Sequence, residues 1–304
     1  MADSSDERLE RARISLEGLS VGDALGGFFE MATPRRVETY FENKRLPPAP
    51  WRYTDDTSMA LSIFLVLRQK QEIDQDYLAE SFARRYDRSR GYGRGARHLL
   101  KRVANGDSWH EVERNMFRGE GSFGNGAGMR VPPIGAYFAD DLNLAANQAA
   151  LSSKITHSHP EGIAGAIAIA VATGMAWQFN HEKSLPGLSD FIDGILSYVP
   201  ETEVKRGIRH ARDFSTATVQ EAATSLGSGF KVSCQDTIPF VLWCAGMFID
   251  DYQTAIMNTM HGGGDVDTTC AMVGGIVVMF TGKESIPAEW LERREELPAW
   301  AFEE

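Results

Sequence analysis

Two acidic clusters are the parts of the sequence best suited to chemistry. Residues 54–57 read Thr-Asp-Asp-Thr, residues 265–268 read Asp-Val-Asp-Thr, and each cluster precedes an apolar run of helical spacing. A helix N-terminus needs one capping side chain, whereas each cluster supplies several, and neighbouring carboxylates repel one another. Divalent cations relieve this repulsion because they prefer oxygen ligands. The sequence therefore predicts a site for two divalent cations, Mg²⁺ first and Mn²⁺ as the alternative, with ligands from Asp55, Asp56, Asp265, Asp267 and the hydroxyls of Thr54 and Thr268.

The second cluster also has the Asp-x-Asp-x-Thr spacing of the nucleophile loop in haloacid-dehalogenase-like phosphatases. That loop should follow a hydrophobic strand near the N-terminus of an α/β domain. Here the cluster follows His261 and three glycines, lies near the C-terminus and leads into a predicted helix. We therefore reject the phosphatase interpretation.

A glycine-rich stretch over residues 119–128 is the second feature with chemical potential. It matches neither a Walker A loop nor the dinucleotide-binding glycine pattern. Glycines allow several backbone N–H groups to turn toward one anion, so the stretch is a candidate cradle for phosphate. Phe123 is placed to stack on a base or sugar. A flexible surface turn remains the alternative.

Helical patterns dominate the elements that must position these residues. Apolar residues at helical spacing cover residues 9–19, 59–67, 162–177 and 270–280. Asp74 is expected to cap one further helix, and Ser108 with Glu111 forms a candidate capping box. Strand signals are scarce. We predict an all-α fold, a compact orthogonal helical bundle over residues 1–304 as a single domain, with a central dimetal site.

Three stretches lack a clear pattern: residues 31–53, 88–95 and 118–133. A long irregular segment is often a lid or a binding segment. Trp51 and Tyr53 close the first stretch, and the sequence leaves open whether they line the site or only pack beside it.

The bulk properties exclude several classes of protein. The net charge of −11 opposes binding to a nucleic-acid backbone. The three cysteines, Cys234, Cys244 and Cys270, lack the spacing of a zinc site or a disulfide framework, so we interpret them as buried residues in a reducing compartment. The N-terminus has no apolar signal region, and the longest uncharged apolar run has 16 residues, below the ~20 that cross a bilayer. We expect a cytoplasmic protein without a membrane partner.

Taken together, these residues resemble the ADP-ribosylglycohydrolase family, which includes the dinitrogenase reductase activating glycohydrolases. The matching pieces occur in the family's order, span residues 22–268 and have a specific combined signature. They are Gly22-Asp23-Ala24-Leu25-Gly26 with Glu30, residues 54–57, residues 121–126 with Met129-Arg130, Thr156-His157, residues 236–239, and residues 263–268. Val266 departs from the polar residue of many members, but it lies between the expected ligands.

The resemblance implies a compact all-α fold around two metal ions, with the six ligands given above. It places Glu30 over the metals on a mobile segment and gives His157 a contact with the ligand. The diphosphate and adenosine side would lie against Gly121, Ser122, Phe123, Gly124, Asn125 and Gly126. The catalytic residues implied are Glu30, Asp55, Asp56 and Asp267.

Other polar residues are expected to have structural roles. Asp23 would fix the turn after the first helix, and Asp236 would be a helix N-cap. His159 would be structural, and Arg130 would pair with an internal acid rather than with phosphate.

Glu30 follows Gly26 and Gly27, which are a candidate hinge, and two phenylalanines that could pack the segment down. We expect its carboxylate to cap a metal and to swing away or orient water when substrate enters. An ordinary surface glutamate is the alternative.

The expected function is metal-dependent release of ADP-ribose by cleavage at ribose C1. The substrate would be an ADP-ribosylated protein or a small ADP-ribosyl conjugate, and the enzyme is expected to be a monomer. A non-catalytic ADP-ribose-binding regulatory protein is the main alternative. A nucleoside hydrolase would be expected to bring an α/β sheet, for which the sequence gives little sign. The linkage, whether to arginine, serine, O-acetyl-ADP-ribose or another group, stays open.

Overall fold

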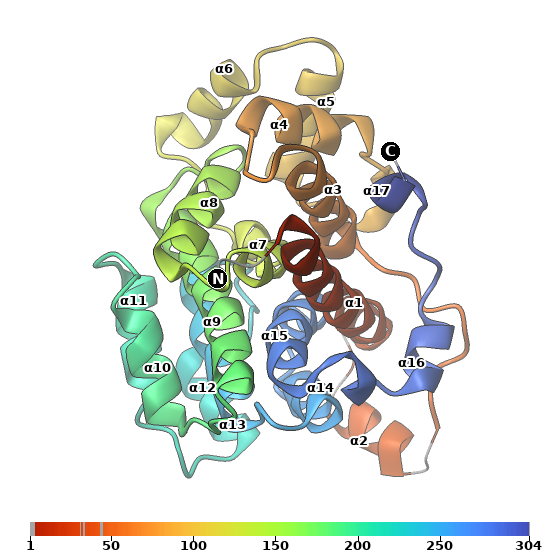
Figure 1. Ribbon diagram of the computed structural model, residues 1–304, viewed down its shortest axis with the longest axis vertical. Helices are drawn as coiled ribbons and strands as arrows, with labels where there is room; N and C mark the ends of the chain where they lie inside the picture. Colours follow the sequence, from red (N-terminus) through yellow and green to blue (C-terminus); the bar gives the residue numbers. More distant parts are fainter. Residues whose placement is uncertain (1–3, 31, 33, 43–44, 304) are drawn as a thin grey trace.

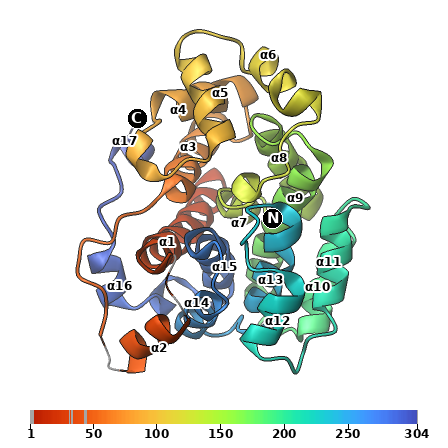
Figure 2. The ribbon, with the colours of Figure 1, turned by 180° about the vertical axis from the view of Figure 1, so that it is seen from behind.

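The fold is described from a computed structural model that covers residues 4–30, 32, 34–42 and 45–303. In this part of the chain every regular element is a helix, which confirms the all-α prediction (Figures 1 and 2). The helices are α1 Ser5–Phe29, α2 Pro34–Glu42, α3 Asp55–Lys70, α4 Gln75–Arg84, η1 Arg88–Arg90, α5 Arg94–Ala104, α6 Trp109–Arg114, η2 Met116–Gly119, η3 Asn125–Ala127, α7 Pro132–Tyr137, α8 Leu142–Lys154, α9 Pro160–His181, α10 Leu188–Leu196, α11 Glu203–Ala211, α12 Val219–Leu226, α13 Cys234–Met247, α14 Tyr252–His261, α15 Val266–Thr281, η4 Lys283–Ser285, α16 Ala288–Arg293 and α17 Trp300–Glu303.

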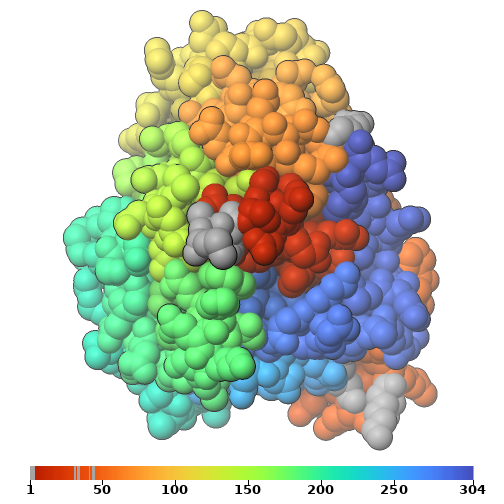
Figure 3. All heavy atoms as spheres, viewed as in Figure 1, coloured from red at the N-terminus to blue at the C-terminus, as the bar shows by residue number. Residues whose placement is uncertain are grey.

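Helices α1 and α15 come from opposite ends of the chain and pack against each other at the centre of the molecule (Figure 1). On the face shown in Figure 3, atoms of the N-terminal part adjoin atoms of the C-terminal part. Gly18, Gly22 and Gly26 recur every four residues and so lie on one face of α1. A Cβ at Gly22 would lie 2.2 Å from the carbonyl oxygen of Cys270 in α15. The glycines therefore allow the two backbones to touch.

Helix α9 forms a second buried axis and packs against α7, α8, α13 and α15. His159 is its N-cap and accepts a hydrogen bond from the backbone N–H of Glu161, as expected of a structural residue. At 22 residues, the helix is longer than the apolar run that predicted it, and by length and composition alone it could cross a membrane. Most of its apolar stretch is buried inside the fold. This burial is what a core helix of a globular protein shows.

The sequence patterns predicted the positions of several helices but not all of their ends and capping hydrogen bonds. Asp74 caps α4 by accepting from Tyr77 N–H, as expected. Ser108 is the N-cap of α6, but its side chain makes no capping hydrogen bond, so the predicted capping box is wrong. Helix α1 runs ten residues beyond the predicted 9–19 segment at its C-terminal end, and α2 lies inside the stretch that showed no pattern. The three cysteines are free and buried, as predicted.

The glycine contact between α1 and α15 gives a stability prediction. We expect Gly22→Ala to lower the free energy of unfolding by about 1–3 kcal/mol, the range for overpacking, although alanine favours a helix by ~1 kcal/mol. Gly93→Ala is the matched control, because a Cβ there meets nothing within 4 Å. Urea unfolding measures both. Equal midpoints for the two variants would contradict the close approach.

Candidate active site

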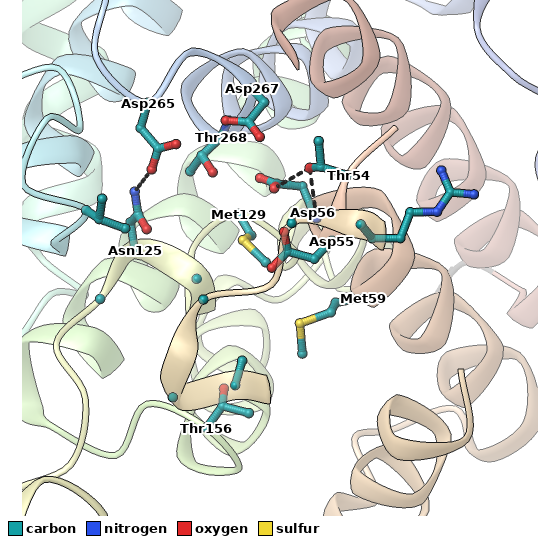
Figure 4. A pocket seen from close by; sticks show the side chains of 18 of the residues that line it. Thr54, Asp55, Asp56, Met59, Asn125, Met129, Thr156, Asp265, Asp267 and Thr268 are labelled. Carbon is teal, nitrogen blue, oxygen red and sulfur yellow. Dashed lines mark hydrogen bonds between the residues drawn. The ribbon is translucent and has the colours of Figure 1, made fainter. Parts of the chain in front are cut away.

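A cavity of about 570 Å³ lies where the C-terminal end of α1 meets the N-terminal ends of α3 and α15. The glycine stretch and the segment before α5 form its other walls. Figure 4 shows four carboxylate side chains from two distant parts of the sequence facing a common space. The expected site residues that line the cavity are Glu30, Thr54, Asp55, Asp56, Ser122, Gly124, Asn125, Gly126, His157, Asp265, Asp267 and Thr268. Gly121 and Phe123 are not on its wall.

The acidic side chains form two overlapping groups. Oxygens of Asp23, Asp56 and Asp267 lie within 4.8 Å of one another, and so do oxygens of Glu30, Asp265 and Asp267. Asp267 belongs to both groups and joins them. Asp55 lines the cavity but belongs to neither group. Either group has the spacing to hold a metal ion, and carboxylate oxygens suit Mg²⁺, Mn²⁺ or Ca²⁺.

Asp23 is the residue whose role the sequence analysis described wrongly. It lies inside α1 rather than in a turn after it, and its side chain is fully buried. It accepts hydrogen bonds from the backbone N–H of Thr54, at 3.0 Å, and from the backbone N–H of Thr57, at 3.1 Å. The hydroxyls of Thr54 and Thr57 also donate to it, at 2.9 and 2.5 Å. Asp23 therefore fixes the first acidic cluster onto α1.

Burial disfavours the ionised form of the acidic side chains and so raises their pKa. It is the main cause that raises the pKa of Asp23 and of Asp267 to about 7, with the charge of a neighbouring aspartate as the second cause. Burial, followed by neighbouring aspartates, also raises the pKa of Asp55 and Asp56 well above the usual range. Buried oxygen Oδ1 of Asp56 accepts no hydrogen bond from the described residues. A bound cation would satisfy this oxygen and offset the repulsion, so the residues fit a metal site.

Glu30 is the C-cap of α1, and its exposed side chain lines the cavity. The charge of Asp267 and then partial burial raise the pKa of Glu30. The proposed glycine hinge before it is wrong, because Gly26 and Gly27 are helical and a Cβ at Gly26 would meet the backbone of α15 at 2.7 Å.

An aromatic cluster holds this end of α1. The rings of Phe28 and Phe29 pack against each other and against Tyr40 of α2, with ring centroids 5.2 to 5.9 Å apart. The two phenylalanines therefore do pack the segment down. The packed helix therefore continues through Phe29, and Glu30 is the first residue after it.

Asn125 ties the glycine stretch to the acidic residues. Its amide donates to Oδ2 of Asp265 at 2.7 Å and to the hydroxyl of Thr237 at 3.1 Å (Figure 4). Gly124 and Gly126 pack on the ring of His157, where an added Cβ would lie 3.2 and 2.9 Å from ring atoms. These glycines bring backbone close to the His157 ring at the cavity wall.

His157 presents a neutral imidazole to the cavity. Burial, and then the charge of Arg130, lowers its pKa to about 3. Its Nδ1 lies 2.7 Å from the hydroxyl of Thr156. A neutral ring offers a hydrogen bond to a ligand rather than a positive charge.

Two further structural expectations were wrong. Arg130 is fully buried, but it donates to the carbonyl oxygens of Ser152 and Gly126 rather than to an acid, because the helices around it present backbone oxygens. Asp236 is not an N-cap, because α13 begins after Ser233. Its carboxylate accepts from Lys231 N–H at 2.8 Å and so holds the loop before α13.

The sequence left open whether Tyr53 and Trp51 line the site, and it missed Phe117. Tyr53 lines the cavity, with the guanidinium of Arg90 3.8 Å from its ring centre, whereas Trp51 is buried beside Trp290. Phe117 is also on the wall and is 47% exposed. The irregular stretch over residues 88–95 was the one available signal for this wall, since loops without pattern often bind ligands.

Comparison with known proteins shows the family to which the chain belongs. Residues 4–303 match the family described as ADP-ribosylglycohydrolase. The chain belongs to this family of hydrolytic enzymes. It is 27% identical to the ADP-ribosylhydrolase ARH3 of Homo sapiens, over 93% of this chain and 88% of that protein. It is 26% identical to the ADP-ribosyl-[dinitrogen reductase] glycohydrolase of Rhodospirillum rubrum, over 93% and 90%.

A solved structure, titled an ADP-ribosylglycohydrolase-related protein complex, shares the fold with a TM-score of 0.61. Its sequence identity is 24%, and the match covers 95% of this chain and 93% of that chain. The family that the sequence motifs resembled is therefore confirmed, together with its helical fold.

The fit of the acidic groups to a cation gives a binding prediction. Mg²⁺ added to metal-free protein should raise the thermal midpoint, because a ligand selective for the folded state stabilises it by ~2.7 kcal/mol at a hundredfold excess over Kd. Asp56→Asn should remove most of this rise, and Asp250→Asn, at an exposed aspartate, should keep it. A full rise in Asp56→Asn would contradict the assignment.

Proposed function

We propose that this protein hydrolyses the bond between ribose C1 and the side chain of an ADP-ribosylated protein and releases ADP-ribose. One observation carries the proposal: the buried acidic groups and the glycine stretch share one cavity, and Asn125 joins them through Asp265. The cavity volume of about 570 Å³ is in the ordinary range for a small-ligand site. The named relatives, which act on ADP-ribosyl groups, support the same substrate class.

The proposed binding half of the site is the glycine wall, which Asn125 joins to the acidic groups. We assign the diphosphate to the backbone around Gly124, Asn125 and Gly126, where no side chain obstructs its approach. His157 supplies a hydrogen bond beside it. Phe117, which is half-exposed on the wall, takes the stacking role that the sequence analysis gave to Phe123. Phe123 instead packs on His159, with ring centroids 5.5 Å apart.

The residues proposed to hold two divalent cations are Thr54, Asp55, Asp56, Asp265, Asp267 and Thr268. Bound cations supply the chemistry of lowering the pKa of a water molecule and fixing oxygen atoms of the substrate. Asp23 keeps Thr54 in place through its two hydrogen bonds, and Asn125 orients Asp265. The backbone N–H of Thr268 donates to Asp267 at 2.8 Å and fixes that carboxylate.

Glu30 is the proposed proton acceptor. As the water oxygen forms its bond to ribose C1, the carboxylate takes a proton from that water, and the target side chain leaves with the electrons of the broken C–O or C–N bond. A carboxylate oxygen of Glu30 lies within 4.8 Å of oxygens of Asp265 and Asp267, so Glu30 is close enough to reach a water held at the acidic groups. Its exposed position at the end of α1 lets it approach a ligand without distortion of the buried acids.

Turnover of defined conjugates tests the function. We expect release of free ADP-ribose from at least one of a panel that carries ADP-ribose on arginine, serine or acetate. Chelation should abolish release, and Mg²⁺ or Mn²⁺ should restore it. Tight binding of ADP-ribose with no release from any conjugate would favour the non-catalytic binding protein. Full turnover in the chelated sample would exclude metal dependence.

The role of Glu30 gives a kinetic prediction. Glu30→Gln should lower kcat by ~10²–10⁴-fold, the usual contribution of a general base. The affinity for ADP-ribose should change little, because the glycine wall is intact, and calorimetry measures it. Glu182→Gln, at an exposed glutamate outside the cavity, is the matched control. A near-normal kcat would show that Glu30 is an ordinary surface glutamate and not the general base.

A further inference from the structure

The segment over residues 84–118 has the opposite charge to the rest of the chain. It contains ten Arg or Lys and four Asp or Glu, a net charge of +6 in a chain whose total is −11. Five exposed arginines in it make no ion pair with the described residues. They are Arg88, Arg94, Arg97, Arg114 and Arg118. Guanidinium groups bind carboxylates in a fixed two-point geometry, so these arginines are free to meet a partner.

The same segment forms one side of the cavity mouth. Ser89, Gly91, Gly93 and Gly95 line the cavity, and Arg88 and Arg94 directly adjoin these positions in the sequence. Arg52 also lines this side and lies 3.3 Å from the hydroxyl of Ser89. Positive charge is therefore concentrated where a substrate enters a site whose base is acidic.

An exposed apolar loop forms another side of the mouth. Phe230 is 85% exposed, and Val232, which lines the cavity, is 59% exposed. Val232 has a φ of 51°, in the left-handed region that β-branched residues rarely adopt. Such strain persists where surrounding contacts enforce it, often at binding sites. Here Asp236 enforces it by accepting from Lys231 N–H and, through its carbonyl, from Gly229 N–H.

Exposed large apolar side chains gather around this mouth. Five are exposed in the described part of the chain, and they are Phe117, Phe123, Leu185, Phe230 and Val232. Phe117 and Val232 are on the wall itself. Phe123 lies beside the apolar loop, because its carbonyl accepts from Cys234 N–H just after that loop. Exposed apolar groups collected in one place mark an interaction surface.

We propose that the cavity mouth is a docking surface for a polypeptide, with acidic residues of the target flanking the modified residue. This inference rests on the proposed function and narrows its protein substrates to those with acidic residues beside the modified residue. The scissile bond must reach the acidic groups at the base, so the target chain on both sides of it must lie across the mouth. Arginines on one side fit acidic residues, and Phe230 and Val232 offer apolar contact on another.

Charge also selects a short acidic segment over a nucleic acid. The residues outside 84–118 carry a net charge of −17. A long polyanion would extend past the arginines and meet this negative surface. In a polypeptide, a short run of acidic residues can lie entirely within the positive region. An arginine-dependent nucleic-acid site is therefore an outcome that the test must be able to detect.

The test compares two peptides that carry ADP-ribose on the same residue, one with acidic and one with uncharged flanks. The variant Arg88→Glu/Arg94→Glu should raise KM for the acidic peptide about tenfold at low salt, with little change in kcat. The difference in KM between this variant and the natural protein should become smaller as salt is added. Phe230→Ser should raise KM for both peptides. O-Acetyl-ADP-ribose or free ADP-ribose, which has no flanking chain, should turn over or bind equally in all variants.

The matched control is Arg206→Glu/Arg209→Glu on α11, which Figures 1 and 2 both place away from α5. It makes the same change in net charge and should leave every KM unchanged. Equal KM values for the two peptides in the natural protein, or equal effects of the two double variants, would overturn the proposal. So would competitive inhibition by a single-stranded oligonucleotide that Arg88→Glu/Arg94→Glu abolishes. Absence of turnover on every conjugate would instead refute the proposed function.

Discussion

The contact between α1 and α15 brings together acidic residues that are more than two hundred positions apart in the sequence. Gly22 and Gly26 remove the side chains that would separate the two backbones, and Asp23 and Glu30 lie on or directly after the same stretch of α1. Asp267 lies in the first turn of α15. A larger spacing between these helices would separate Asp23 from Asp267 and divide the two groups of oxygens. The site thus depends on a backbone contact that contains no catalytic atom.

The electrostatics of the buried acidic side chains favour the binding of a cation. Asp267 lies at a helix N-terminus, where the helix dipole stabilises a negative charge by ~0.3–1 kcal/mol, or up to ~2 in buried geometry. Its pKa nevertheless rises from 3.8 to about 7. Burial and the neighbouring carboxylates therefore outweigh the helix end and the local hydrogen bonds. Hydrogen bonds from the chain position these acids, and a bound cation would favour their ionised form.

The sequence predicted what depends on local pattern and missed what depends on packing. The acidic pairs, the cap at Asp74 and the helix over 162–177 follow from residue type and spacing, and the structure has them. Asp23 was misread because its four hydrogen-bond donors come from a segment about thirty residues further on. Arg130 was misread because carbonyl oxygens, which every sequence contains, serve as its partners. Exposure of Phe117 is likewise a product of the fold, since composition does not distinguish a wall residue from a core residue.

The loop before α13 contributes to the cavity mouth and also holds Asp265 in place. The two roles use different atoms of the loop. A Cβ at Gly229 would meet Cβ of Asp265 at 2.6 Å, and the backbone N–H of Asp265 donates to the carbonyl of Ser228 at 3.1 Å. These contacts and the bond from Lys231 N–H to Asp236 use backbone atoms, Cβ of Asp265 and the carboxylate of Asp236. The exposed side chains at residues 230 and 232 take no part in them. Substitutions there would therefore leave Asp265 in place, so the proposed docking surface could vary in target preference independently of the acidic groups.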